Sequence, residues 1–183
     1  GIIDLGSNNA RLVIVEMLGD GHFIVVDQIK ESVRLGKDME RDGFLKPQRI
    51  AETMRTLKMF RKLCDAYGIE KIIAVATAAV RRAKNQRSFL DEVATTCGIK
   101  FRVLTAEEEA IYVYRGVINT MDVPKGVILE IGGGASLHEF AEFAKASERA
   151  ADADKLGFGI EFFKPFDTLQ LFHEKLFYLR RLL

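Results

Sequence analysis

The chain has no tryptophan, and only two cysteines, three prolines and three histidines among its 183 residues. The cysteines, Cys64 and Cys97, stand in apparently amphipathic stretches without CxxC or Cys/His spacing. Two reduced core thiols are therefore favoured over a disulfide or a metal site. Such thiols fit a cytoplasmic protein, which is the localisation we expect.

Long apolar runs and net charge are also missing. The sequence contains no stretch of 18 apolar residues and no pattern typical of a signal peptide, so a membrane span is not expected. Lys plus Arg number 27 against 26 for Asp plus Glu, a net charge of +1. This balance gives no general attraction to a membrane or to double-stranded nucleic acid. A bound anion must instead meet a local basic cluster.

What is present begins with residues 3–11, Ile-Asp-Leu-Gly-Ser-Asn-Asn-Ala-Arg. An apolar run carries an acid, Asp4, and is followed by Gly6, Ser7 and Asn8 before apolar residues resume. This order indicates strand, tight turn, strand. Backbone N–H groups of a glycine turn can form a concave anion site, and Asp4 could hold a metal. A plain hairpin turn with an incidental acid is the alternative.

Residues 127–136 repeat this design, with an apolar run carrying Glu130, the glycines Gly132, Gly133 and Gly134, and then Ser136. Two such turns in one chain suggest a duplicated fold with facing phosphate loops. The pair resembles the phosphate motifs of the actin-like, hexokinase-like ATPase superfamily. Intervening residues resemble its exopolyphosphatase and guanosine pentaphosphate phosphatase branch. The matching pieces, in the family's order, are residues 3–12, 76–85 with 89–90, 105–110 and 131–134.

The elements predicted along the chain agree with this resemblance. Strands are expected at residues 10–17, 23–29, 72–76, 101–104 and 127–131 in addition to the first, with helices from Pro47 to Gly68, after Asn85 as helix cap, and from Thr105 to Thr120. The fold class is α/β: an actin-like (ribonuclease H-like) domain with a mixed five-stranded sheet flanked by helices. We expect this domain at residues 1–137, and a helical tail or partial second domain at residues 138–183. Because the chain opens with Gly1, we expect a fragment or the ordered part of a larger protein.

A basic cluster follows the predicted strand 72–76. Arg81, Arg82, Lys84 and Arg87 place four positive charges within seven residues. A charge run is usually a solvated helix face. Here it follows the carboxyl end of a strand, where α/β sheets bind ligands, which favours a phosphate site. Arg34, in a predicted loop, has the same two interpretations.

The resemblance implies roles for these residues. Gly6, Ser7, Asn8, Arg81, Gly132, Gly133, Gly134 and Ser136 would bind phosphate, while Asp4 and Glu130 would hold Mg²⁺. Glu109 would be the catalytic base, with Glu108 the runner-up. Acids at a helix start are also ordinary stabilisers of the helix dipole. The chain differs from the family where Glu130 replaces an aspartate and where Leu137 replaces a glutamate.

The implied activity is hydrolysis of terminal phosphates from inorganic polyphosphate or from guanosine pentaphosphate, with Mg²⁺ as cofactor. Its partners would be polyphosphate or a phosphorylated guanine nucleotide, and a homodimer is allowed. Leu137, in place of an acid, favours the alternative of a non-catalytic phosphoanion-binding or nucleotide-binding regulatory module. An ATP-dependent sugar or acetate kinase is a third interpretation, but it explains the Arg81 segment and Glu108 with Glu109 poorly.

Overall fold

The computed structural model describes residues 1–18 and 22–120. The chain forms two compact units, the first built from Gly1–Thr105 and the second beginning at Ala106. The predicted strand 127–131, the second glycine turn and the helical tail lie outside the described residues. In the described part of the chain, no helix is both long enough and apolar enough to cross a bilayer.

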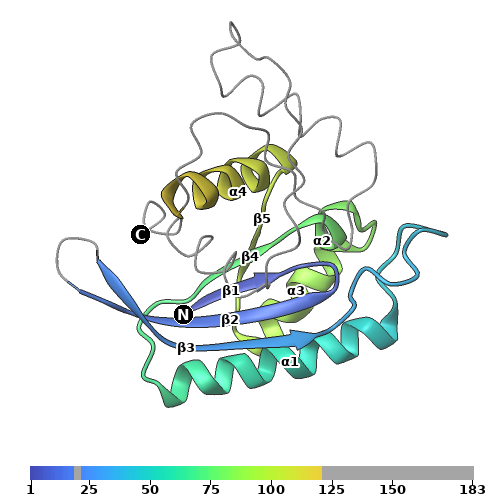
Figure 1. The fold of residues 1–183 in the computed structure, drawn as a ribbon. Coiled ribbons are helices and arrows are strands. Elements are labelled where there is room, and N and C mark those ends of the chain that lie inside the picture. The colour runs from blue at the N-terminus through green and yellow to red at the C-terminus, as the bar shows by residue number, and fades with distance from the viewer. Residues whose placement is uncertain (19–21, 121–183) are drawn as a thin grey trace, which may run out of the picture. The chain divides into compact units, whose positions relative to one another are not determined.

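A mixed sheet of five strands organises the first unit (Figure 1). Its order is β3-β2-β1-β4-β5, formed by β1 (Ile2–Leu5), β2 (Asn9–Met17), β3 (Phe23–Ser32), β4 (Ile73–Ala76) and β5 (Phe101–Val103). The β1–β2 and β2–β3 pairs are antiparallel, whereas β1–β4 and β4–β5 are parallel. The predicted sheet, antiparallel at its start and parallel at its end, is confirmed.

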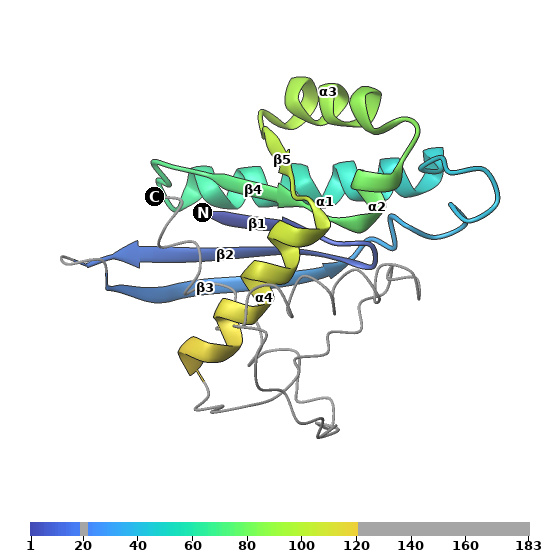
Figure 2. The same ribbon diagram turned by 90° about the horizontal axis from the view of Figure 1, so that it is seen from above.

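Alternation along β1 separates the two faces of the sheet. Ile3 and Leu5 are fully buried in the core, whereas Asp4 points to the other face, as expected for a strand with a period of two residues. Both α1 (Pro47–Ala66) and α3 (Gln86–Cys97) lie on the face of Ile3 and Leu5 (Figure 2). The core therefore lies between these two helices and the sheet.

The helices follow from the apolar spacing of the sequence. Pro47 occupies the first turn of α1, and the predicted stripe is buried at Met54, Leu57, Phe60 and Cys64. Helix α3 ends at Gly98, whose φ of 65° lies in the left-handed region that glycine adopts easily. Burial raises the pKa of the Cys64 and Cys97 thiols, which are free and buried.

Two further helices flank the β4 and β5 segments in sequence. A short helix that the sequence did not predict, α2 (Ala78–Arg82), follows β4, and Ala83 ends it in an extended conformation before α3. In the second unit, α4 (Ala106–Thr120) carries Glu107, Glu108 and Glu109 in its first turn, as predicted. The acids therefore do begin a helix.

Candidate functional site

Three parallel strands end at the same edge of the sheet. Leu5 is in register with Ala76, and Ala76 with Val103. Beyond these positions the Thr77 amide donates to the Leu5 carbonyl at 3.2 Å, and the Leu104 amide donates to the Ala76 carbonyl at 2.9 Å. Residues that follow β1, β4 and β5 are therefore brought together at a carboxyl edge, where α/β sheets bind ligands.

The tight turn, residues 6–8, is fixed at this edge by main-chain hydrogen bonds. Within it, the Gly6 amide donates to the Asn9 carbonyl at 2.9 Å. The Asn8 carbonyl accepts from the amides of Val33 and Arg34 at 2.9 and 2.8 Å. These bonds tie the turn to the end of β3, so its own conformation does not depend on a ligand.

Gly36 packs directly against the tight turn. Its amide donates to the Ser7 carbonyl at 2.9 Å. A Cβ at this position would lie 3.2 Å from the Ser7 Cβ and 3.4 Å from the Ala79 Cβ. A larger side chain would therefore be crowded at this position, where glycine allows the loop to approach both the turn and the start of α2.

Arg34 has a strained backbone two residues before this contact. Its φ is +46°, in the left-handed region that side chains other than glycine rarely adopt. The side chain is exposed. Strain of this kind persists where the surroundings impose it and is frequent at ligand sites. Arg34 therefore remains a candidate contact for an anion.

Arg81 lies in α2, after the carboxyl end of β4, as the sequence predicted. Its amide donates to the Thr77 carbonyl at 2.9 Å, and its Nη1 donates to the Leu104 carbonyl at 3.0 Å. This second bond ties α2 to the end of β5. A guanidinium carries five N–H donors in a rigid fork, so one arginine can hold a carbonyl and an anion together.

Asp4 is half-buried, one residue before the end of β1, and is in register with Arg11 on one side and Val75 on the other. Its carboxylate is the hard oxygen donor that Mg²⁺ prefers. The described residues contain no group of three or more potential metal ligands. The role of Asp4 as a metal ligand therefore stays a prediction.

The remaining predicted residues are not all placed. Glu108 and Glu109 belong to the second compact unit, and their roles stay predictions. Glu130, Gly132, Gly133, Gly134 and Ser136 lie outside the described residues. The structure thus brings together Gly6, Ser7 and Asn8 with Arg81, and leaves the other half of the predicted site untested.

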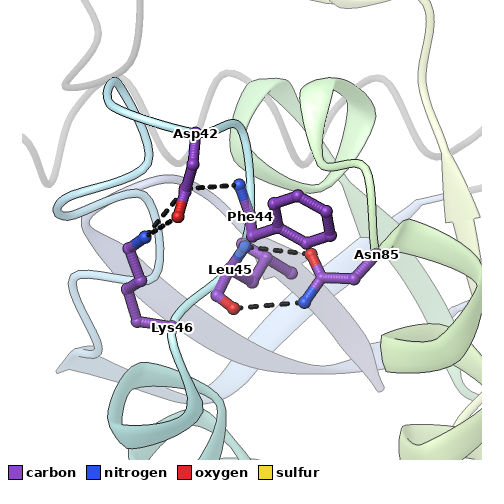
Figure 3. A network of polar contacts seen from close by, with 5 residues as sticks. All are labelled: Asp42, Phe44, Leu45, Lys46 and Asn85. Carbon is purple, nitrogen blue, oxygen red and sulfur yellow. Dashed lines mark hydrogen bonds and ion pairs between the residues drawn. The ribbon is translucent and has the colours of Figure 1, made fainter.

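The prediction that the Asn85 side chain caps the following helix is wrong. Asn85 occupies the N-cap position of α3, but its side chain makes no capping hydrogen bond. Instead the carboxamide accepts from the Leu45 amide at 2.9 Å and donates to the Leu45 carbonyl at 3.1 Å (Figure 3). Asn85 therefore anchors the chain before α1, because it satisfies both main-chain groups of a buried residue 40 positions away.

The same loop carries an acid that braces its own backbone. Asp42 accepts from the Lys46 ammonium at 2.7 Å and from the Phe44 amide at 3.0 Å (Figure 3). These bonds hold the pKa of Asp42 below its usual range. The loop from Gly36 to Lys46 is thus held at Ser7 by one end and at Asn85 by the other.

Sequence reasoning missed Gly36 and Thr77 as parts of this edge. Gly36 comes two residues after Arg34, which the sequence placed in a loop, and its packing depends on contacts with residues far away in the chain. Thr77 directly follows β4 and is only 8% exposed. A small polar residue immediately after a buried strand was the available indication for Thr77.

With this geometry established, comparison with known proteins identifies the family. A model of the Ppx/GppA phosphatase family matches residues 13–149, which is most of the chain. The chain belongs to the Ppx/GppA phosphatase family. This finding confirms the resemblance on which the sequence analysis was based.

Individual members of the family are similar to a large part of the chain. A bifunctional 3-dehydroquinate synthase/phosphatase of Fusobacterium nucleatum is 34% identical over 143 residues, covering 73% of this chain and 22% of that protein. The crystal structure of an exopolyphosphatase from Cytophaga hutchinsonii is 30% identical with a TM-score of 0.68, covering 73% of this chain and 43% of that one. The Aquifex aeolicus Ppx/GppA family member is 38% identical with a TM-score of 0.58, covering 62% and 37%.

The chain spans less than half the length of each of these relatives. Its mixed sheet therefore corresponds to one part of a Ppx/GppA protein. What the relatives act on bears on this chain only as a proposal.

Proposed function

We propose that the protein hydrolyses terminal phosphoanhydride bonds of inorganic polyphosphate or of guanosine pentaphosphate. The observation that carries this proposal is the convergence of the tight turn and the Thr77–Arg81 segment at one carboxyl edge, in a chain of the Ppx/GppA family. A hairpin turn and a solvated arginine run have no reason to share an edge. A phosphoanion needs both amide donors and a fixed cation.

In this mechanism the substrate is held by the phosphate-binding residues that the family resemblance implies. The amides of Ser7, Asn8 and the glycine turn 132–134, with the Ser136 hydroxyl, would donate to phosphate oxygens, and Arg81 would bind a non-bridging oxygen. Gly6, whose amide donates to the Asn9 carbonyl at 2.9 Å, would serve the site by holding the turn in shape. Asp4 and Glu130 would hold Mg²⁺, which when bound neutralises phosphate charge. The site thus lowers the repulsion that an attacking water meets.

The remaining requirement is a group that removes a proton from that water. Glu109 takes this role, because the resemblance aligns it with the family's catalytic glutamate, and Glu108 is the runner-up. A carboxylate in the first turn of α4 also lies at the positive end of the helix dipole. The proton leaves the water as its oxygen bonds to the terminal phosphorus and the bridging P–O bond breaks.

The test measures phosphate release from polyphosphate and from guanosine pentaphosphate, with Mg²⁺, for the intact protein and two variants. Glu109→Gln should lower release by about 10² or more, because the amide cannot accept the proton. Glu107→Gln, in the same helix turn, should release phosphate at the original rate. Unchanged release by Glu109→Gln would remove Glu109 from the mechanism.

The second candidate function is a non-catalytic phosphoanion-binding or nucleotide-binding module. Leu137, which replaces an acid of the family pattern, favours it. Calorimetric titration with tripolyphosphate beside the release assay separates the two functions. Binding without any phosphate release would favour the module, whereas release would establish the hydrolase.

A further inference from the structure

Three polar residues of the described chain are buried: Ser7, Thr53 and Thr77. Buried hydroxyl groups almost always have a hydrogen-bond partner, because burial without one costs free energy. Thr53, fully buried in α1, follows this rule, since its hydroxyl donates to the Arg49 carbonyl at 2.8 Å. Thr53 therefore shows how a structural threonine is satisfied in this fold.

Thr77 is different. It is 8% exposed, and its hydroxyl neither caps α2 nor bonds any other group among the residues that the structure describes. The Thr77 main chain is fully used, with its amide on the Leu5 carbonyl and its carbonyl accepting from the Arg81 amide. The backbone position is thus fixed while the side-chain donor is left for something else.

The surroundings of Thr77 indicate which kind of group its hydroxyl would bind. Thr77 follows Ala76, the register partner of Leu5, and Leu5 is followed by Gly6 of the tight turn. Two positions earlier, Val75 is in register with Asp4. Thr77 therefore lies across from the tight turn, four residues before Arg81, at the edge where amide donors and a guanidinium already meet.

We propose that the Thr77 hydroxyl is a phosphate-binding group of this edge, donating to a non-bridging oxygen of the bound phosphoanion beside the amides of the tight turn. The proposal rests on the proposed function and adds to it a residue to which the sequence assigned no role. Ser7, also 8% exposed and likewise without a side-chain partner in the described chain, would be the corresponding hydroxyl on the turn itself.

The test compares Thr77→Val, Thr77→Ser and Thr53→Val in the intact protein by calorimetric titration with tripolyphosphate and Mg²⁺. Valine keeps the shape of threonine and removes only the hydroxyl. A hydrogen bond to a charged phosphate should make Thr77→Val bind about tenfold to hundredfold more weakly. Thr77→Ser restores the donor and should bind within a few-fold of the original protein, while Thr53→Val should bind unchanged.

Thermal melting of the same proteins supplies the second measurement. Thr77→Val should melt at the original temperature or slightly above it, because the hydroxyl has no partner in the folded chain. A lower melting temperature would show a structural partner and overturn the proposal. Equal binding by Thr77→Val and the original protein would also overturn it, leaving the proposed function intact. If the original protein fails to bind tripolyphosphate, the proposed function and the proposal for Thr77 are both contradicted.

Discussion

The antiparallel half of the sheet has two turns, and the described residues at these turns differ in burial. The tight turn, residues 6–8, is held from outside by the Val33, Arg34 and Gly36 amides, and it buries Ser7. Of the distal turn between β2 and β3, the structure describes the two ends, where the Leu18 amide donates to the His22 carbonyl at 2.7 Å. Near it Met17, Leu18, Ile24 and Val26 are exposed. The support of the tight turn from outside and the burial of Ser7 favour a task for this turn beyond reversing the chain.

The largest expected effect comes from crowding the tight turn. Gly36→Val would place side-chain atoms within about 3 Å of Ser7 and Ala79, which are themselves held by the sheet edge. We expect tripolyphosphate affinity to fall by about 10² or more, measured by calorimetric titration. Gly36→Ala should give a smaller loss in the same direction.

The matched control is His22→Ala in the distal turn, which should bind tripolyphosphate as the original protein does. If the Gly36 and His22 variants lose the same amount of tripolyphosphate affinity, the two turns do not differ in their role in binding. Thermal melting of each variant separates lost binding from lost folding.

A smaller effect is expected where the loop that supports the tight turn is anchored. Asn85→Ala would leave the amide and carbonyl of Leu45 without their partners, and Leu45 is only 2% exposed. We expect a loss of about 1–3 kcal/mol in the free energy of unfolding, measured in urea. Asp42→Asn weakens an exposed ion pair of the same loop and should change the free energy of unfolding little. An unchanged free energy of unfolding in the Asn85→Ala protein would mean that the loop is held by other contacts.

The smallest effect is expected for Arg34, where one substitution should act differently on stability and on tripolyphosphate affinity. Arg34→Gly removes the strain at φ +46°, so the free energy of unfolding should stay unchanged or rise by up to about 1 kcal/mol. Tripolyphosphate affinity should fall a few-fold, because a cation is lost beside the tight turn. Arg34→Lys keeps the charge and the strain, and should show neither change. If Arg34→Gly binds normally, the arginine is a solvated loop residue.

Local patterns in the sequence predicted most of this fold. The sequence predicted a helix from Pro47 to Gly68, a helix after Asn85, and strands at residues 10–17 and 23–29, and the structure has α1, α3, β2 and β3 at these places. Glycine, acid and small hydroxyl residues also identified the tight turn, which the structure places between β1 and β2.

What the sequence did not reveal depends on contacts between distant residues. Asn85 was expected to cap α3, which is its commonest local role, but Leu45 lies 40 positions away and offers two main-chain partners instead. The short helix α2 was also missed, because a helix of five residues is too short to show an apolar repeat in the sequence. Gly36 looked like an ordinary loop glycine because its neighbours, Ser7 and Ala79, are brought to it only by the fold.

The central claim is that the tight turn and the Thr77–Arg81 segment form one phosphoanion-binding edge. Amide chemical shifts in ¹H–¹⁵N NMR spectra, recorded as tripolyphosphate is added with Mg²⁺, test it most directly. The amides of Gly6, Ser7 and Asn8 and those of residues 77–81 should shift along one saturating curve, while Leu18 and His22 stay in place. Shifts confined to other elements, or separate saturation of the two segments, would contradict the claim.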